Sequence, residues 1–283
     1  MKTMKTIKMM AMAVVMVAFG AASFAENITV KGSDTLVILG QKWAEVYMKG
    51  HPGTTVQVTG GGSGTGIAAL LNDTTDICNS SRPMKPSEIA DTVKKFKSRP
   101  REYKMCVDAL SVYVHESNPL TQISIPQLEA IFTGKITNWK QVGGPDAPIS
   151  LYGRENSSGT YEFFKENVLN KKDFAASTKT MPGTAAVIQG VSKDKGGIGY
   201  GGVAYAAGCK SLKVSKTDGG EAIEPNEENA ISFKYPISRF LFNYVAPAKD
   251  NGAVAAYIQW CVSDEGQAVV KDVGYFPLPK NLR

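Results

Sequence analysis

The chain of 283 residues has 32 basic and 26 acidic side chains and a net charge of +6. Because this excess is small and no basic block or basic–aromatic alternation accompanies it, we do not expect nucleic acid as a partner. The chain is long enough for two modest domains or one large one. Its two histidines and four widely spaced cysteines form no close ligand pairs, so we expect neither a metal ion nor another cofactor.

The first 25 residues have the pattern of a secretory signal peptide. Lys2, Lys5 and Lys8 form a basic start, residues 9–19 are an apolar run shorter than a comfortable membrane span, and residues 23–25 are a small-x-small cleavage signal. An uncleaved N-terminal anchor would need a longer apolar run. No cysteine immediately follows the cleavage position, so a lipid anchor is not expected. We therefore predict a soluble periplasmic protein that is exported across the inner membrane.

The four cysteines leave two interpretations open. In an oxidising compartment one or two disulfides can form, and Cys78 with Cys106 is the favoured pair because both lie beside predicted strands of one half of the chain. The alternative is that Cys78, Cys106, Cys209 and Cys261 are buried free thiols, which is an equally good interpretation.

Three predicted strands in the first half of the chain each end in a polar run and continue as a helix. The strand–run–helix units cover residues 26–47, 56–71 and 76–99. In the first helix, Leu39, Trp43 and Tyr47 fall on one face. The polar runs are Gly32-Ser33-Asp34-Thr35, Gly60-Gly61-Gly62-Ser63-Gly64-Thr65-Gly66 and Asn79-Ser80-Ser81-Arg82.

The second half continues the alternation of strands and helices. Strands are predicted at 107–114, 149–152, 196–200 and 240–245, and helices at 124–132, 161–169, 184–193, 253–261 and 266–271. This alternation predicts an α/β fold with largely parallel sheets. In such folds ligands bind beyond the carboxyl ends of the strands, at helix N-termini, and all the polar runs lie at such positions.

The run from Gly153 to Thr160 combines a permanent cation, hydroxyls and a glycine at the start of a predicted helix. Arg154 supplies the charge, and the free N–H groups of the helix N-terminus would face the same place, which suits an oxyanion. Each run alone is more simply a helix cap. Three hydroxyl-rich strand-to-helix turns, at 32–35, 60–66 and 153–160, with the central Arg154 in a secreted chain, favour convergence on one ligand.

An enzyme is poorly supported by the same residues. The run 60–66 completes neither G-x-G-x-x-G nor G-x-S-x-G and has no P-loop lysine. His51 and His115 are remote in sequence from every polar run, so Ser63 and Ser158 have no evident base. A secreted serine hydrolase or phosphatase therefore stays only as an alternative, and we predict binding without catalysis.

Five motifs occur in the order and spacing of the periplasmic phosphate-binding proteins of ABC-type phosphate importers, which the sequence resembles over essentially all of its predicted mature chain. They are Gly32–Thr35, Gly61–Gly66, Asn79–Pro83, Ile131–Trp139 and Arg154–Thr160. The resemblance implies a class II periplasmic-binding fold, in which two α/β domains close on the ligand. It places domain one at 26–108 with 241–283, domain two at 112–237, and the two crossover strands near 106–112 and 236–242.

The resemblance also implies a set of phosphate ligands. By position these are Thr35, Ser63, Arg154, Ser158, Gly159 and Thr160, with Ser33 and Ser81 as further hydroxyls. Some family members have, in the third run, an aspartate that accepts a hydrogen bond from protonated phosphate and so rejects sulfate. Here Ser81 and Arg82 stand at that place. We predict that Asp34 takes the acceptor role and that Arg82 adds a second cation or pairs with Asp34; the alternative is that Asp34 only caps a helix.

The partners implied by the resemblance are inorganic phosphate and the membrane permease subunits of an ABC transporter, and we expect a monomer. Two further alternatives, besides the hydrolase, stay open at this point. The ligand could be another tetrahedral oxyanion, namely sulfate, molybdate or tungstate. The protein could also scavenge its ligand at the cell surface without an importer.

Overall fold

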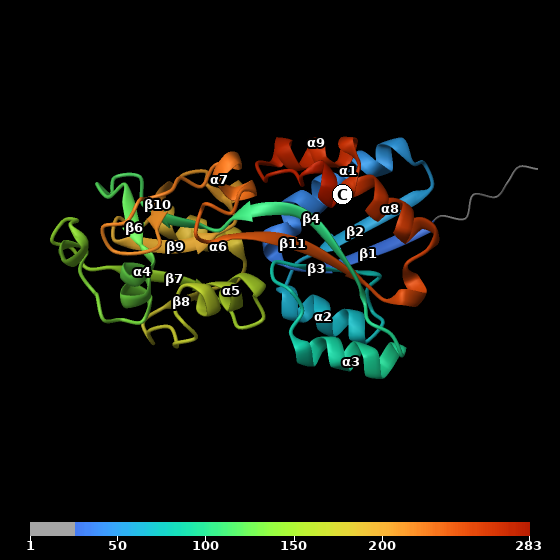
Figure 1. Ribbon diagram of the computed structural model, residues 1–283, viewed down its shortest axis with the longest axis horizontal. Helices are drawn as coiled ribbons and strands as arrows, with labels where there is room; N and C mark the ends of the chain where they lie inside the picture. The colour runs from blue at the N-terminus through green and yellow to red at the C-terminus, as the bar shows by residue number, and fades with distance from the viewer. Residues whose placement is uncertain (1–25) are drawn as a thin grey trace, which may run out of the picture.

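The computed structural model describes residues 26–283, so the predicted signal peptide lies outside the described residues. Two α/β lobes lie side by side along the long axis of the molecule (Figure 1), each built on a mixed sheet. The strand order is β2-β1-β3-β11-β4 in the first lobe and β6-β10-β5-β9-β7-β8 in the second. The predicted two-domain α/β fold is confirmed. Within residues 26–283, no helix combines the length and apolarity needed to cross a bilayer.

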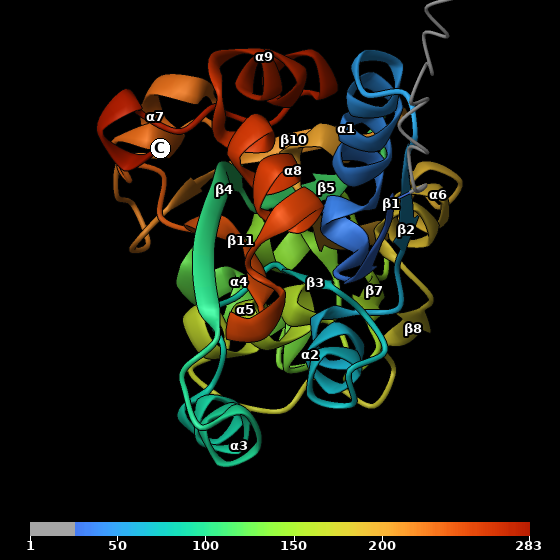
Figure 2. The same cartoon turned by 90° about the vertical axis from the view of Figure 1, so that its right-hand side faces the viewer.

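The first lobe takes its elements from both ends of the described chain. They are β1 (Glu26–Gly32), α1 (Val37–Gly50), β2 (Thr54–Thr59), α2 (Ser63–Leu71), β3 (Ile77–Ser80), α3 (Pro86–Phe96), β4 (Arg101–Ala109), β11 (Ser238–Val245), α8 (Gly252–Val262) and α9 (Asp264–Val273). Helices α1, α8 and α9 cover one face of the sheet, and α2 and α3 cover the other (Figures 1 and 2). The apolar stripe of α1 produces this packing, since Trp43 is buried and its indole N–H donates to Gly266 O of α9 at 2.7 Å.

The second lobe is formed by the middle of the chain. Its elements are β5 (Ser111–Val114), β6 (Gln122–Ser124), α4 (Ile125–Phe132), β7 (Ser150–Arg154), α5 (Gly159–Asn167), β8 (Lys179–Met181), α6 (Thr184–Ser192), β9 (Gly197–Gly201), β10 (Lys210–Ser215) and α7 (Glu227–Ile231). Phe132, Trp139 and Phe164 lie in its core. The short strands β6, β8 and β10 and the helix α7 do not follow from the sequence pattern, because their runs are brief and partly exposed.

The chain passes between the lobes twice, and both passages use neighbouring segments. The predicted strand 107–114 is in fact two strands, because β4 ends at Ala109 in the first sheet and β5 begins at Ser111 in the second. Strand β11 returns beside β4 with antiparallel pairing. Both lobes bury their strands here, so the apolar pattern runs on across the change of lobe and does not reveal it.

The expected largely parallel sheets are only partly found. Strand β1 is parallel to β2 and β3, and β7 is parallel to β8 and β9. The four antiparallel pairings all involve β5 or β11. For β4 and β11 the physical reason is the connection between the lobes, since a segment that leaves a lobe and one that returns to it run side by side in opposite directions.

The predicted disulfide between Cys78 and Cys106 is wrong, since all four cysteines are free thiols. Strand β11 separates β3, which carries Cys78, from β4, which carries Cys106. Two strand spacings are about 10 Å, whereas bonded cysteines need Cα atoms within about 7 Å. The two thiols also pack in different apolar clusters, Cys78 beside α2 and Cys106 beside α8 and α9.

We predict that all four cysteines are free thiols and that only Cys209 reacts in the native state. Burial raises the pKa of Cys209 to about 11 and raises those of Cys78, Cys106 and Cys261 as well, but only Cys209 is partly exposed. At pH 8 a maleimide should therefore label only Cys209 in the native protein, and label it slowly. After unfolding without a reductant it should label all four cysteines. Mass spectrometry counts the labels in each case. The Cys209→Ser variant should lose the native label. If the unfolded wild type carried two labels instead of four, the other two cysteines would be joined in a disulfide.

Candidate functional site

Four buried hydroxyls meet between the lobes. Thr35, Ser63 and Ser81 come from the three polar runs of the first lobe, and Thr160 comes from the N-terminus of α5 in the second. Thr160 Oγ1 lies 2.7 Å from Thr35 Oγ1 and 3.2 Å from Ser81 Oγ, and Ser81 Oγ lies 3.3 Å from Ser63 Oγ. We call these four side chains the hydroxyl cluster. Segments up to 125 residues apart in the chain thus present hydroxyls to one point.

Two helix N-termini face the hydroxyl cluster because glycines allow their close approach. Helix α2 begins at Ser63 after Gly62, which has a φ of +94°, and α5 begins at Gly159. A Cβ on Gly62 would lie 2.5 Å from Ser157 O, and one on Gly159 would lie 2.3 Å from Ser63 Oγ. Any side chain at either position would push the lobes apart. The positive ends of both helix dipoles therefore point between the lobes.

Arg154 is the buried cation of this site, with a side chain 1% exposed. Its Nη2 donates to Asp34 Oδ2 at 2.6 Å and to Glu155 Oε1 at 2.8 Å, its Nε to Glu155 Oε2 at 3.2 Å, and its Nη1 to Thr184 Oγ1 at 2.9 Å. These bonds engage four of the five guanidinium hydrogens and leave one on Nη1. Burial lowers the pKa of Arg154, but its bonds to Glu155 and Asp34 outweigh burial and raise it, so the charge is permanent.

Glu155 holds Arg154 from the same lobe. Burial raises the pKa of Glu155, but the hydrogen bonds and charge of Arg154 exceed that effect, so the pKa is lowered and the carboxylate stays ionised. Neither Glu155 nor Thr184 was singled out as a site residue from the sequence. Glu155 is adjacent to Arg154 in the chain, which is a signal that could have identified it.

Asp34 reaches across from the first lobe to the cation of the second. Its Oδ1 accepts from Gly61 N–H at 2.9 Å and its Oδ2 from Arg154, while its backbone carbonyl accepts from Tyr205 Oη at 2.7 Å. Asp34 is the first residue of a short 3₁₀ helix (Asp34–Leu36), whose N-cap is Ser33 without a side-chain cap bond. The carboxylate bonds to groups outside that helix, so Asp34 is not merely a helix cap.

Ser158 and Ser33, the remaining predicted hydroxyls, each lie next to a residue already described. Ser158 is the N-cap of α5 and its Oγ accepts from Tyr161 N–H at 3.2 Å, which leaves the hydroxyl hydrogen free to be donated. Ser33 is buried at the end of β1, and its backbone N–H donates to Asn79 O at 3.0 Å. The structure therefore brings Asp34, Thr35, Ser63, Ser81, Arg154, Ser158, Gly159 and Thr160 to the interface between the lobes, no contact places the Ser33 hydroxyl there, and one predicted residue pairs elsewhere.

The exception is Arg82, for which the predicted pairing with Asp34 is wrong. Its guanidinium binds both carboxylate oxygens of Glu88, at 2.8 and 2.7 Å, and also donates to Pro83 O at 2.9 Å. Glu88 lies in the first turn of α3 and caps it by accepting from Lys85 N–H at 2.7 Å. Arg82 is thus paired with Glu88 of α3, and the partner of Asp34 is Arg154 instead.

A buried pair of opposite charges was missed by the sequence reasoning. Arg239 on β11 and Asp108 on β4 face each other in register, are 4% and 0% exposed, and form two bonds from Nε and Nη2 to Asp108 Oδ2 at 2.9 and 2.8 Å. The signal was present, because isolated charges in two apolar strands are rarely buried unless they pair. Both residues lie where the chain passes between the lobes.

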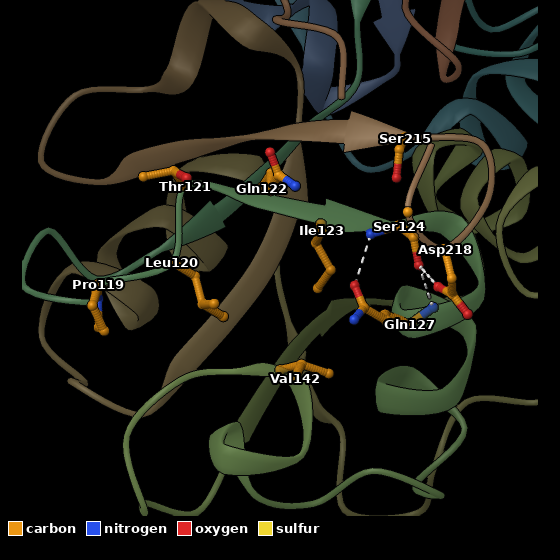
Figure 3. A pocket seen from close by; sticks show the side chains of 11 residues that line it. Pro119, Leu120, Thr121, Gln122, Ile123, Ser124, Gln127, Val142, Ser215 and Asp218 are labelled. Carbon is orange, nitrogen blue, oxygen red and sulfur yellow. Dashed lines mark hydrogen bonds between the residues drawn. The ribbon is translucent and has the colours of Figure 1, made fainter. Parts of the chain in front are cut away.

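A cavity in the second lobe is poorly suited to bind an oxyanion. It has a volume of about 390 Å³ and is lined by the residues labelled in Figure 3, none of which is a lysine or arginine. Ser124, Gln127 and Asp218 point toward one another, and the Ser124 hydroxyl donates to the Asp218 carboxylate (Figure 3). The negative charge of Asp218 would repel an anion. Within residues 26–283 we find no cluster of three or more histidine, cysteine or acidic side chains arranged to hold a metal ion.

Comparisons with known proteins give a consistent set of relatives. A family model described as a PBP superfamily domain matches residues 18–265. The phosphate-binding protein PstS of Pseudomonas aeruginosa is 36% identical, over 93% of this chain and 86% of that protein. The PstS protein of Staphylococcus haemolyticus is 32% identical, over 88% of this chain and 80% of that protein.

Solved structures resemble this chain over most of its length. An ABC-type phosphate transport receptor from Vibrio cholerae has a TM-score of 0.71 and 26% identity, and covers 90% of this chain and 100% of its own. A structure from Clostridium perfringens, assigned as a phosphate ABC transporter substrate-binding protein with bound phosphate, has a TM-score of 0.82 and 25% identity, with the same coverage.

We predict that the Arg82–Glu88 ion pair contributes to stability in a pH-dependent way. Burial raises the pKa of Glu88, but the bond to Arg82 outweighs it, so the pKa lies below the ordinary 4.5. A lowered pKa stabilises the fold above about pH 4.5, and this stabilisation is lost as the pH falls through the folded-state value. Glu88→Gln should therefore lower the free energy of unfolding by about 1.5–3 kcal/mol at pH 7, and less below pH 4.5.

Urea unfolding from pH 7 to pH 3.5 measures this difference. The matched control is Glu45→Gln, which alters an exposed pair with Lys42 and Lys49 on α1 and should leave stability almost unchanged. If the loss of unfolding free energy caused by Glu88→Gln did not vary with pH, the assignment of this stabilisation to the ionised Glu88 carboxylate would be contradicted.

Proposed function

This chain belongs to the PBP superfamily, and from that premise we propose that it captures inorganic phosphate between its lobes and delivers it to the membrane permease subunits of an ABC importer. The observation that carries the proposal is that the hydroxyl cluster meets the N-termini of α2 and α5 between the lobes, while Asp34, next to Thr35 in the chain, binds the Arg154 guanidinium across the same interface. The proposed function is binding, with no chemical step.

The site supplies the donors that a buried phosphate needs. A dianion leaves water only where many hydrogen-bond donors replace it. We propose that hydroxyls, helix N–H groups and the remaining Arg154 hydrogen fill this role. The proposed ligands are Ser33, Thr35, Ser63, Ser81, Arg154, Ser158, Gly159 and Thr160. Asp34 and Glu155 fix the orientation of Arg154, so little side-chain entropy is lost when phosphate binds.

We propose that Asp34 also distinguishes phosphate from sulfate. Each of its carboxylate oxygens already accepts one hydrogen bond, from Gly61 N–H or from Arg154, and each has a further lone pair. Protonated phosphate can donate a hydrogen to such a lone pair. Sulfate has no proton at neutral pH, so its oxygen would meet the carboxylate without a hydrogen between them and be repelled.

Closure of the lobes would accompany binding. We place domain one at 26–108 with 241–283 and domain two at 112–237, moving about the two passages between the sheets. Besides the hydroxyl cluster, several contacts hold the lobes together: Gly64 N–H donates to Ser157 O at 2.9 Å, Lys85 Nζ lies 2.8 Å from Glu162 Oε1, and Arg154 pairs with Asp34. Phosphate would shift the equilibrium toward this closed form, which the permease recognises. We further propose that the protein acts as a monomer in the periplasm after cleavage of residues 1–25.

We predict that calorimetric titration of residues 26–283 with phosphate gives saturable heat, whereas sulfate and molybdate give little. Equal heats with phosphate and sulfate would remove the selectivity proposal. No heat with any of the three anions would refute the binding function. Steady turnover of a chromogenic phosphate ester, abolished in Ser63→Ala, would instead support the hydrolase alternative.

We predict that Asp34→Asn lowers the phosphate affinity about tenfold or more and lowers the sulfate affinity less, because an amide can present its NH₂ to either anion but a carboxylate accepts only from phosphate. The matched control is Glu155→Gln, which also removes a carboxylate from Arg154 and should weaken both anions alike. The measured quantity is the ratio of the two dissociation constants. A ratio that Asp34→Asn leaves unchanged would limit Asp34 to holding Arg154.

A further inference from the structure

Arg239 contacts both lobes beside the hydroxyl cluster. Its Nη1 donates to Ser81 O at 3.0 Å in the first lobe, and its Nη2 donates to Thr160 Oγ1 at 3.0 Å in the second. The ring of Phe163, on α5, lies over the guanidinium with its centroid 5.1 Å from Cζ. The side chain is 3% exposed, so its charge acts in a place where water screens little.

The bond from Arg239 determines what the Thr160 hydroxyl can do. A hydroxyl that accepts from a guanidinium turns its own hydrogen toward another acceptor. The neighbouring oxygens of Thr160 are Thr35 Oγ1 at 2.7 Å and Ser81 Oγ at 3.2 Å, both in the hydroxyl cluster. Arg239 thus directs the hydrogen of Thr160 toward the point where we place the anion.

Asp108 holds Arg239 without competing for the anion. Its Oδ2 accepts from Nε and Nη2 of Arg239, and its Oδ1 accepts from Val203 N–H at 3.0 Å. Both oxygens are therefore engaged by donors of the protein. Arg239 keeps one Nη1 hydrogen beyond those engaged by Asp108, Ser81 and Thr160.

We propose that Arg239 is the second cation of the phosphate site and a positioning residue that makes Thr160 a fixed hydrogen-bond donor to the anion. This assignment rests on the proposed function. It gives to Arg239 the role that sequence reasoning gave to Arg82, whose guanidinium is bound by Glu88 instead.

The experiment compares phosphate dissociation constants of purified variants by calorimetry. Arg239→Gln should weaken phosphate binding about 10- to 100-fold. Because this change leaves Asp108 buried without its partner, the neutral pair Asp108→Asn with Arg239→Gln is made as well, and it should fold and show a similar loss. The control Arg82→Gln removes another buried guanidinium, one outside the hydroxyl cluster, and should change the phosphate dissociation constant less than twofold.

A double-mutant cycle separates positioning from a general structural effect. In a Thr160→Ala background, Arg239→Gln should weaken phosphate binding only a few-fold, because the hydroxyl that Arg239 directs is already absent. If Arg239→Gln lowered the phosphate affinity by the same factor in the wild type and in Thr160→Ala, the positioning role of Arg239 would be overturned. Wild-type affinity in the folded neutral pair would overturn the assignment of Arg239 altogether. Absence of phosphate binding by the wild type would refute the proposed function, and this inference with it.

Discussion

The cleft depends on one buried interaction, the guanidinium of Arg154 held between Asp34 of the first lobe and Glu155 of the second. A buried cation is tolerated only when carboxylates and hydrogen bonds replace its water. Here one of the two carboxylates comes from the opposite lobe. Arg154 therefore gains its second carboxylate and completes its hydrogen bonds only when the lobes meet.

The formal charges around the cleft do not add up to a positive site. Arg154 and Arg239 carry two positive charges, and Asp34, Glu155 and Asp108 carry three negative ones. Attraction for an anion must therefore come from oriented donors rather than net charge. At the site that we propose, the hydroxyl cluster and the N-termini of α2 and α5 provide them at short range. Such a site selects by the positions of hydrogens, since Coulomb attraction alone would accept any small anion.

Much of the local structure could be predicted from the sequence. Periodicity correctly placed β1, α1, β7 and α5, because their apolar residues recur at strand or helix spacing and their ends carry caps and glycines. The position of the polar runs between strand and helix also predicted that they are neighbours in the fold, and their hydroxyls are in contact. Short, half-exposed elements such as β6 and β8 were not predicted, because a strand of three residues is too short to show a hydrophobic periodicity.

The sequence by itself determined which residues are cations, hydroxyl donors and helix starts, since these properties follow from residue type and near neighbours. Only the tertiary structure decided which of them pair. Arg82 and Arg154 are chemically equal, yet a carboxylate on α3 takes one and a carboxylate across the cleft engages the other. Arg239 and Asp108 lie 131 residues apart and meet only because β11 returns beside β4. The same fact separates Cys78 from Cys106. Pairing over such distances depends on strand order, which no local pattern encodes.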